Sequence, residues 1–159
     1  MRGIRLSTMG VVVLVVTLGL VVGVALADQH SGTWKANVAK STYGTGQAPR
    51  MMTLKIESDA TSFKVSGDGT DAAGKAMHTE FSAKFDGKDY PVTGNPYGDT
   101  VSVKRVDADT TESTFKKGGK VTVTVTSVVS KDGKTRTSTY KGKDAEGHDV
   151  NAVVVYDKQ

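Results

Sequence analysis

The chain has 159 residues, no cysteine and 18 glycines, and its length suggests a single domain. Its first 27 residues contain 2 of the 21 basic side chains; the rest carries 19 basic and 17 acidic ones, and this net charge of +2 does not indicate a nucleic-acid partner. After residue 27 there are 15 valines and 18 threonines but a single leucine, Leu54, which excludes a helix bundle because Val and Thr favour strands.

The N-terminal segment has the three parts of a secretory signal peptide. Two arginines are followed by an uncharged stretch over 6–27, which ends in Ala25-Leu26-Ala27. We expect cleavage after Ala27, which leaves a single domain over residues 28–159. The alternative is a membrane anchor, because 22 uncharged residues are long enough to span a bilayer. Both interpretations place the domain outside the cytoplasm, in the bacterial periplasm or the extracellular space.

The absence of cysteine limits how the domain is anchored and stabilised. It excludes a lipid anchor on cysteine, and it excludes the disulfides that small secreted folds often use. A domain of this size buries roughly two-thirds of its surface on folding, which is sufficient without disulfides.

Turn signals divide the domain into ten segments with strand character. Pairs such as Gly87-Lys88 and Gly133-Lys134, each after an aspartate, favour tight hairpin turns. A further break is predicted at Gly67-Asp68-Gly69. The predicted strands cover residues 32–37, 51–57, 61–67, 75–84, 88–93, 100–106, 110–117, 120–130, 134–142 and 148–157.

These segments alternate between apolar and polar residues, most clearly at Val121, Val123 and Val125. A period of two is typical of antiparallel strands with one buried face. Because most connections are short, we expect an all-β, antiparallel up-and-down barrel of about eight to ten strands, which leaves no free sheet edge. A two-sheet sandwich is the alternative. The long connection at 38–50 is expected to lie over one barrel mouth.

The segment 134–142 departs from this pattern because neither of its faces is apolar. Its threonines alternate with Arg136, Ser138 and Tyr140. In a barrel this indicates a lumen that is partly polar, and the alternative is an exposed, poorly buried strand.

At the start of the domain, Ser31-Gly32-Thr33-Trp34-Lys35 resembles the Gly-x-Trp signature on the first strand of lipocalins and related calycin barrels. The resemblance implies a barrel that holds a ligand in its lumen. It also implies that Gly32 and Trp34 close one end of the barrel, with the tryptophan packed beneath it.

The last strand, Val153 to Lys158, resembles the end of the cytosolic fatty-acid-binding proteins. Those proteins finish with an Arg-x-Tyr pair that grips the ligand carboxylate. Here Tyr156 matches the tyrosine, but Val154 stands where the arginine is expected. They also insert a helix-turn-helix after the first strand, whereas 38–50 is too rich in Gly, Pro and Thr for one.

The sequence offers little support for an enzyme. It has no cysteine nucleophile, no Gly-x-Ser-x-Gly elbow, no phosphate loop and no His-Glu-x-x-His motif. We therefore expect no enzymatic activity, no cofactor and no metal. His78 and His148 are assigned to strands, on the faces opposite the core. A transition-metal site requires that both instead face one lumen.

Two functions of different classes remain. The first is an exported barrel, expected to be a monomer, that binds a small apolar or amphipathic molecule in its lumen. Such a barrel requires a cavity of several hundred Å³. The alternative is a structural or interaction barrel of the cell envelope whose interior is filled by side chains. The candidate ligand contacts in the lumen are Tyr140, Tyr156, Arg136, Phe81 and Phe115.

Overall fold

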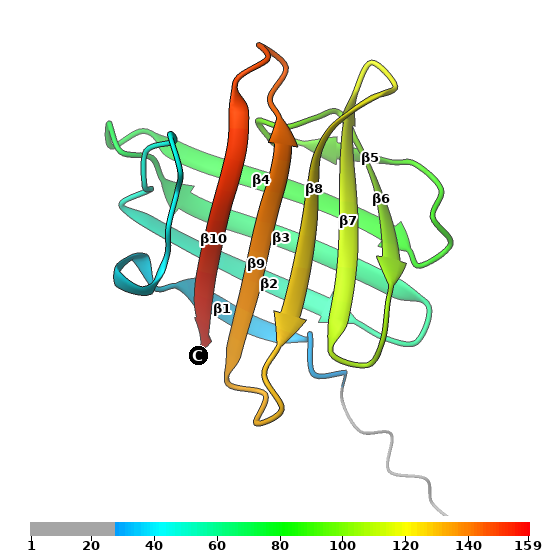
Figure 1. Cartoon of the computed structure of the whole chain (residues 1–159). Helices are drawn as coiled ribbons and strands as arrows, with labels where there is room; N and C mark the ends of the chain where they lie inside the picture. The colour runs from blue at the N-terminus through cyan, green and yellow to red at the C-terminus, as the bar shows by residue number, and fades with distance from the viewer. Residues whose placement is uncertain (1–27) are drawn as a thin grey trace, which may run out of the picture.

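The computed structural model describes residues 28–159, so the predicted signal peptide lies outside the described residues. Ten antiparallel strands close into one barrel (Figure 1). The strands are β1 (Gly32–Ala36), β2 (Met51–Ser58), β3 (Ser62–Thr70), β4 (Ala76–Lys84), β5 (Tyr90–Thr93), β6 (Thr100–Arg105), β7 (Thr110–Lys117), β8 (Lys120–Val129), β9 (Thr135–Lys143) and β10 (Asp149–Lys158).

Each strand pairs with its neighbour in sequence, and β1 also pairs with β10, which closes the sheet. In Figure 1, β2, β3 and β4 run across the back at a steep angle to β7, β8, β9 and β10 in front. The predicted up-and-down barrel and its ten strands are therefore confirmed, and the sandwich alternative is wrong. Closure satisfies the backbone groups that an open sheet would leave at its edges.

One predicted turn is wrong, because Gly67-Asp68-Gly69 lies inside β3. Close packing between strands, and not a turn, is the reason for glycine at these two positions. A Cβ on Gly67 would come within 2.9 Å of a Leu54 methyl group, and one on Gly69 would come within 2.5 Å of the Met51 carbonyl. Glycine at both positions lets β2 and β3 pack closely there.

The barrel has a closed end and an open end. The closed end carries the start of the domain, the β6–β7 and β8–β9 turns and the C-terminus, which lie at the bottom of Figure 1. The open end carries the β3–β4, β7–β8 and β9–β10 turns together with the segment 37–50. The core fills the closed half, where Trp34, Ile56, Phe63, Val103 and Val129 are at most 2% exposed.

The segment 37–50 contains one turn of 3-10 helix, η1 (Val38–Lys40), and no helix-turn-helix. Beyond η1 it runs along β10, where Thr42 and Val153 exchange two backbone hydrogen bonds of 2.8 Å. Its next residues reach the open mouth, where Tyr43 and Pro49 line a cavity. In the part of the chain that the structure describes, no helix is long and apolar enough to cross a membrane.

Candidate functional site

A cavity of about 680 Å³ occupies the open half of the barrel. Its volume is in the predicted range and is typical of small-molecule pockets, which span roughly 300 to 1,000 Å³. A lumen filled by side chains, as the alternative interpretation requires, does not match this cavity.

The cavity has one apolar wall and one partly polar wall. Met52 and Leu54 from β2 and Met77 and Phe81 from β4 line the apolar wall. The facing wall is built by β7, β8 and β9 and carries three serines at inward positions. These are Ser113, Ser127 and Ser138. Such a lumen accommodates a molecule with both apolar and polar surfaces.

Of the two interpretations of the segment 134–142, the polar lumen is the one the structure supports. Arg136, Ser138 and Tyr140 all point inward from β9 and line the cavity. The Ser138 hydroxyl lies 2.8 Å from that of Ser127, and both residues are buried. This pair satisfies two polar groups that would otherwise be costly to bury.

Arg136 lies at the base of the cavity and is 4% exposed. Its Nη1 lies 2.9 Å from Nδ1 of His30, and its guanidinium carbon lies 5.7 Å from the centre of the Phe63 ring. Burial lowers the pKa of Arg136 to about 10, so the side chain remains charged at neutral pH. Among residues 28–159, no carboxylate forms an ion pair with it, and its Nε has no hydrogen-bond partner.

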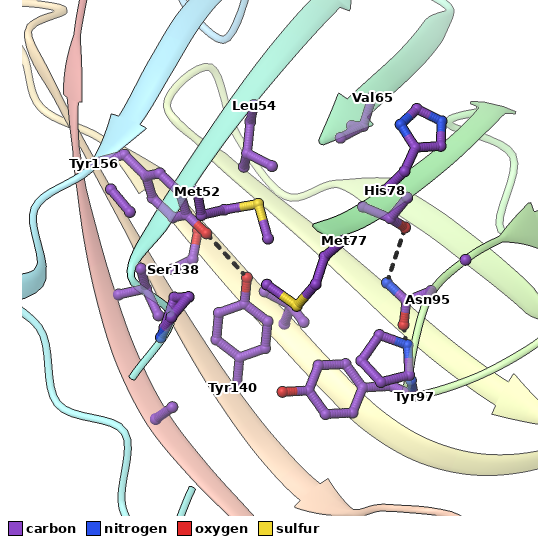
Figure 2. Close-up of a pocket in the computed structure, with 18 of the residues that line it drawn as sticks. Met52, Leu54, Val65, Met77, His78, Asn95, Tyr97, Ser138, Tyr140 and Tyr156 are labelled. Atoms are coloured by element: carbon purple, nitrogen blue, oxygen red, sulfur yellow. Dashed lines mark hydrogen bonds between the residues drawn. The ribbon is translucent and has the colours of Figure 1, made fainter. Parts of the chain in front are cut away.

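The hydroxyls of Tyr140 and Tyr156 point toward each other inside the cavity (Figure 2). The hydroxyls of Tyr140 and Tyr156 lie 3.4 Å apart, and burial raises the pKa of both residues, so both stay protonated. Tyr43 also lines the cavity, and its buried hydroxyl has no partner within the described chain. Three hydroxyls and one guanidinium therefore add polar groups to those of the serine wall.

The mouth of the cavity is bordered by the loop that joins β5 to β6. Tyr97 in this loop packs against Tyr140 and Phe115, with ring centres 6.0 and 6.3 Å apart. Burial raises the pKa of Tyr97 to about 12. β4 and β5 are paired at only two positions. Near the mouth, the edge of β4 that does not pair with β3 therefore lies against this loop and not against a strand. Gly94 makes the turn with φ of +65°, and its Cα lies against the β4 backbone at His78.

The structure brings all five predicted lumen residues, Tyr140, Tyr156, Arg136, Phe81 and Phe115, to the wall of this cavity. Val154 lines it as well, on the strand where the fatty-acid-binding proteins carry their arginine. The guanidinium of this cavity comes instead from β9, where Arg136 is the cross-strand partner of Tyr156 on β10.

Gly32 and Trp34 lie at the opposite, closed end. Trp34 is fully buried and donates from Nε1 to the His30 carbonyl at 2.9 Å. The Lys158 ammonium lies 4.9 Å from the centre of the indole ring. A Cβ on Gly32 would come within 2.7 Å of Lys158 Cε, so glycine leaves room for this lysine to cover the tryptophan.

The two histidines considered for a metal do not face one lumen. His78 points outward from β4, and its Nδ1 lies 2.8 Å from Asp68. His148 lies in the β9–β10 turn rather than in a strand, and its Nδ1 lies 3.0 Å from Asp144. With Glu146, these two turn residues place three potential ligand atoms within 4.8 Å of one another. Asp144 Oδ1 accepts two backbone N–H groups there, which is ordinary turn chemistry.

Sequence analysis missed His30 and Tyr43. Both precede or follow the first strand in segments without periodicity, and neither the alternation of residues nor a motif marks them. The serine wall had a signal, because Ser127 continues the every-second-residue series of Val123, Val125 and Val129 that faces inward on β8.

Neither a protein-family model nor a curated protein matches the sequence. The barrel is similar to the crystal structure of the zebrafish ileal bile acid-binding protein in complex with cholic acid, with a TM-score of 0.51 and 12% sequence identity. The match covers 82% of this chain and 99% of the zebrafish chain. The fold is therefore that of a calycin-type barrel, as the resemblance at Gly32 and Trp34 implied.

Proposed function

We propose that this protein binds a small amphipathic molecule in its barrel, with an anionic group at Arg136 and an apolar body along the wall formed by β2 and β4. The observation that carries this proposal is a buried guanidinium that lines the cavity without a carboxylate partner in residues 28–159. A buried charge is costly unless it is paired. An anionic ligand group supplies the missing partner, and it accepts hydrogen bonds from the guanidinium.

Two further features support an amphipathic ligand. The Tyr43 hydroxyl is buried without a partner in the described chain, and the hydroxyls of Tyr140 and Tyr156 lie near Arg136, so several donors converge on one region. The rest of the lining is largely aliphatic and aromatic, which suits an apolar body. The similarity to a barrel solved with cholic acid, an amphipathic acid, agrees with this chemistry.

A pair of fluorescent probes tests the proposal. Anilinonaphthalene sulfonate and N-phenylnaphthylamine share an aromatic body, and only the former carries an anionic group. We expect Arg136→Met to weaken sulfonate binding by about tenfold or more, since a hydrogen bond to a charged group contributes about 1.5 to 3 kcal/mol. Binding of the uncharged probe should change by less than about threefold.

Lys141→Met is the matched control, because it removes the same charge from an exposed position on the same strand. It should leave both affinities unchanged. Failure of the wild-type protein to bind either probe contradicts the proposal, as does an equal loss of both probes in Arg136→Met. Native mass spectrometry of protein from its own cells then identifies the molecule that co-purifies with it.

We also propose that the domain is exported, monomeric and non-enzymatic, with its signal peptide removed after Ala27. The basic start, apolar stretch and small residues of the segment 1–27 support export. The intact mass of the protein isolated from its own cells should correspond to a chain that begins at Asp28. A mass that includes the first 27 residues contradicts cleavage and favours the membrane anchor.

A further inference from the structure

The four residues Asp28 to Ser31, which precede β1, form a plug in the closed end of the barrel. The Asp28 carboxylate forms an ion pair with Arg105 of β6 and accepts a hydrogen bond of 3.1 Å from Ser58 of β2. The backbone N–H of His30 donates to Asp28 at 3.0 Å. These contacts tie the start of the domain to strands on two sides of the barrel.

The plug carries His30 into the core beneath Arg136. The imidazole is fully buried, and its ring centre lies 6.2 Å from that of Phe63 in an edge-to-face arrangement. Its Nδ1 lies 2.9 Å from Nη1 of Arg136. Because a guanidinium only donates, Nδ1 must be the unprotonated acceptor, and the ring proton is on Nε2.

This contact fixes the guanidinium without cancelling its charge. A carboxylate in the place of His30 would hold Arg136 equally well, but it would neutralise the charge that the cavity presents. A neutral imidazole occupies one N–H group and leaves the positive charge available to a ligand. Burial and the charge of Arg136 lower the pKa of His30 to about 4, which is consistent with a neutral ring at neutral pH.

We propose that His30 is a positioning residue for Arg136, so that the N-terminal plug forms part of the ligand site and selects anionic over uncharged ligands. This inference rests on the proposed function, since it concerns the same cavity. It assigns a binding role to residues directly after the predicted cleavage site. The ligands that this arrangement favours carry a carboxylate or sulfonate on an apolar body.

The same probe pair tests the inference through the ratio of the two affinities. In His30→Leu, which fills the same buried position with an apolar side chain and removes the acceptor, we expect the preference for the sulfonate probe to fall by about tenfold. His30→Gln retains an acceptor oxygen and should restore the ratio to within about threefold of wild type. His148→Leu removes an exposed histidine and should have no effect.

A purely structural role for His30 would weaken both probes equally, and that result overturns the inference. An unchanged ratio of the two affinities in His30→Leu also overturns the inference. If that ratio still falls in Arg136→Met, the proposed function stands without it. If the wild-type protein binds neither probe, both proposals fall.

A second measurement uses only the wild-type protein and does not depend on the folding of a variant. The ¹⁵N shifts of the His30 ring at neutral pH should show a neutral imidazole with Nδ1 unprotonated, and the Nδ1 signal should move when the sulfonate probe is added. A proton on Nδ1, or a signal that ignores the probe, overturns the inference.

Discussion

Acidification is expected to destabilise this barrel through His30. Burial and the charge of Arg136 lower the pKa of the imidazole from its ordinary value of 6.5 to about 4; Arg105 acts in the same direction, while Asp28 and Asp109 oppose it. In the unfolded chain the same ring takes up its proton near its ordinary pKa. Between the two values the unfolded state binds more protons, so the free energy of unfolding falls as the pH drops from 6.5 to about 4.

The size of this effect follows from the two pKa values of His30. Their difference corresponds to about 3 kcal/mol, at about 1.4 kcal/mol for each pH unit. With a urea m-value of about 2 kcal/mol/M, the unfolding midpoint of the wild type should fall by about 1.5 M over this range. The non-titrating variant His30→Gln should show a much smaller fall.

Urea unfolding followed by circular dichroism, in small steps between about pH 4 and about pH 7, measures both curves. Carboxylates that titrate in both proteins cancel in the difference. His78→Gln serves as a control, because the hydrogen bond with Asp68 raises the pKa of His78, and its contribution is present in acid and lost as the pH rises. Parallel curves for the wild type and His30→Gln would refute the burial of a neutral imidazole.

Three further substitutions test the barrel and its cavity. Trp34→Phe leaves a buried carbonyl without its donor, so calorimetry should record a loss of about 1 to 3 kcal/mol and a lower Tm; an unchanged Tm contradicts the role of the indole N–H. Gly94→Ala places a Cβ against the β4 backbone, whereas the Cβ of Gly133→Ala meets no atom within 4 Å. Gly94→Ala should therefore lower the Tm more than Gly133→Ala does. Equal losses would contradict the close approach of Gly94 to β4. Ser138→Ala leaves the buried Ser127 hydroxyl without its partner and should lower the free energy of unfolding by about 1 to 3 kcal/mol. Replacement of both serines by Ala should cost less than the sum of the two single changes. Additivity in a double-mutant cycle would contradict the pairing.

The barrel could be predicted from the sequence because its signals are local. Alternation places the inward valines of β8, and Asp-Gly pairs mark the β4–β5 and β8–β9 turns within a residue or two. The exception, at Gly67 and Gly69, has a physical reason. Glycine supports a turn and a close approach between strands equally well, and only the neighbouring strand distinguishes the two.

The lumen residues were also accessible to sequence reasoning, since Tyr140, Tyr156 and Arg136 lie on one face of two regular strands. The plug was not. His30 lies 106 positions from Arg136 in the chain and has no repeating pattern around it. Their contact depends on closure of the barrel, which brings the start of the domain beneath β9. No local pattern encodes a meeting of that kind.

Burial of Arg136 in the cavity lowers the stability of the free protein while it serves the proposed ligand site. A buried cation without an acidic partner costs free energy, which His30 and the face of Phe63 offset only in part because both are uncharged. A methionine of similar volume would avoid that cost, so Arg136→Met should unfold no more readily than the wild type even as it loses the sulfonate probe. The cavity itself acts in the same direction, because about 680 Å³ of lumen forgoes the packing that a filled barrel would gain. Both features destabilise the free protein, and the proposed anionic amphipathic ligand would relieve both. The protein should therefore resist heat better with that ligand bound than without it.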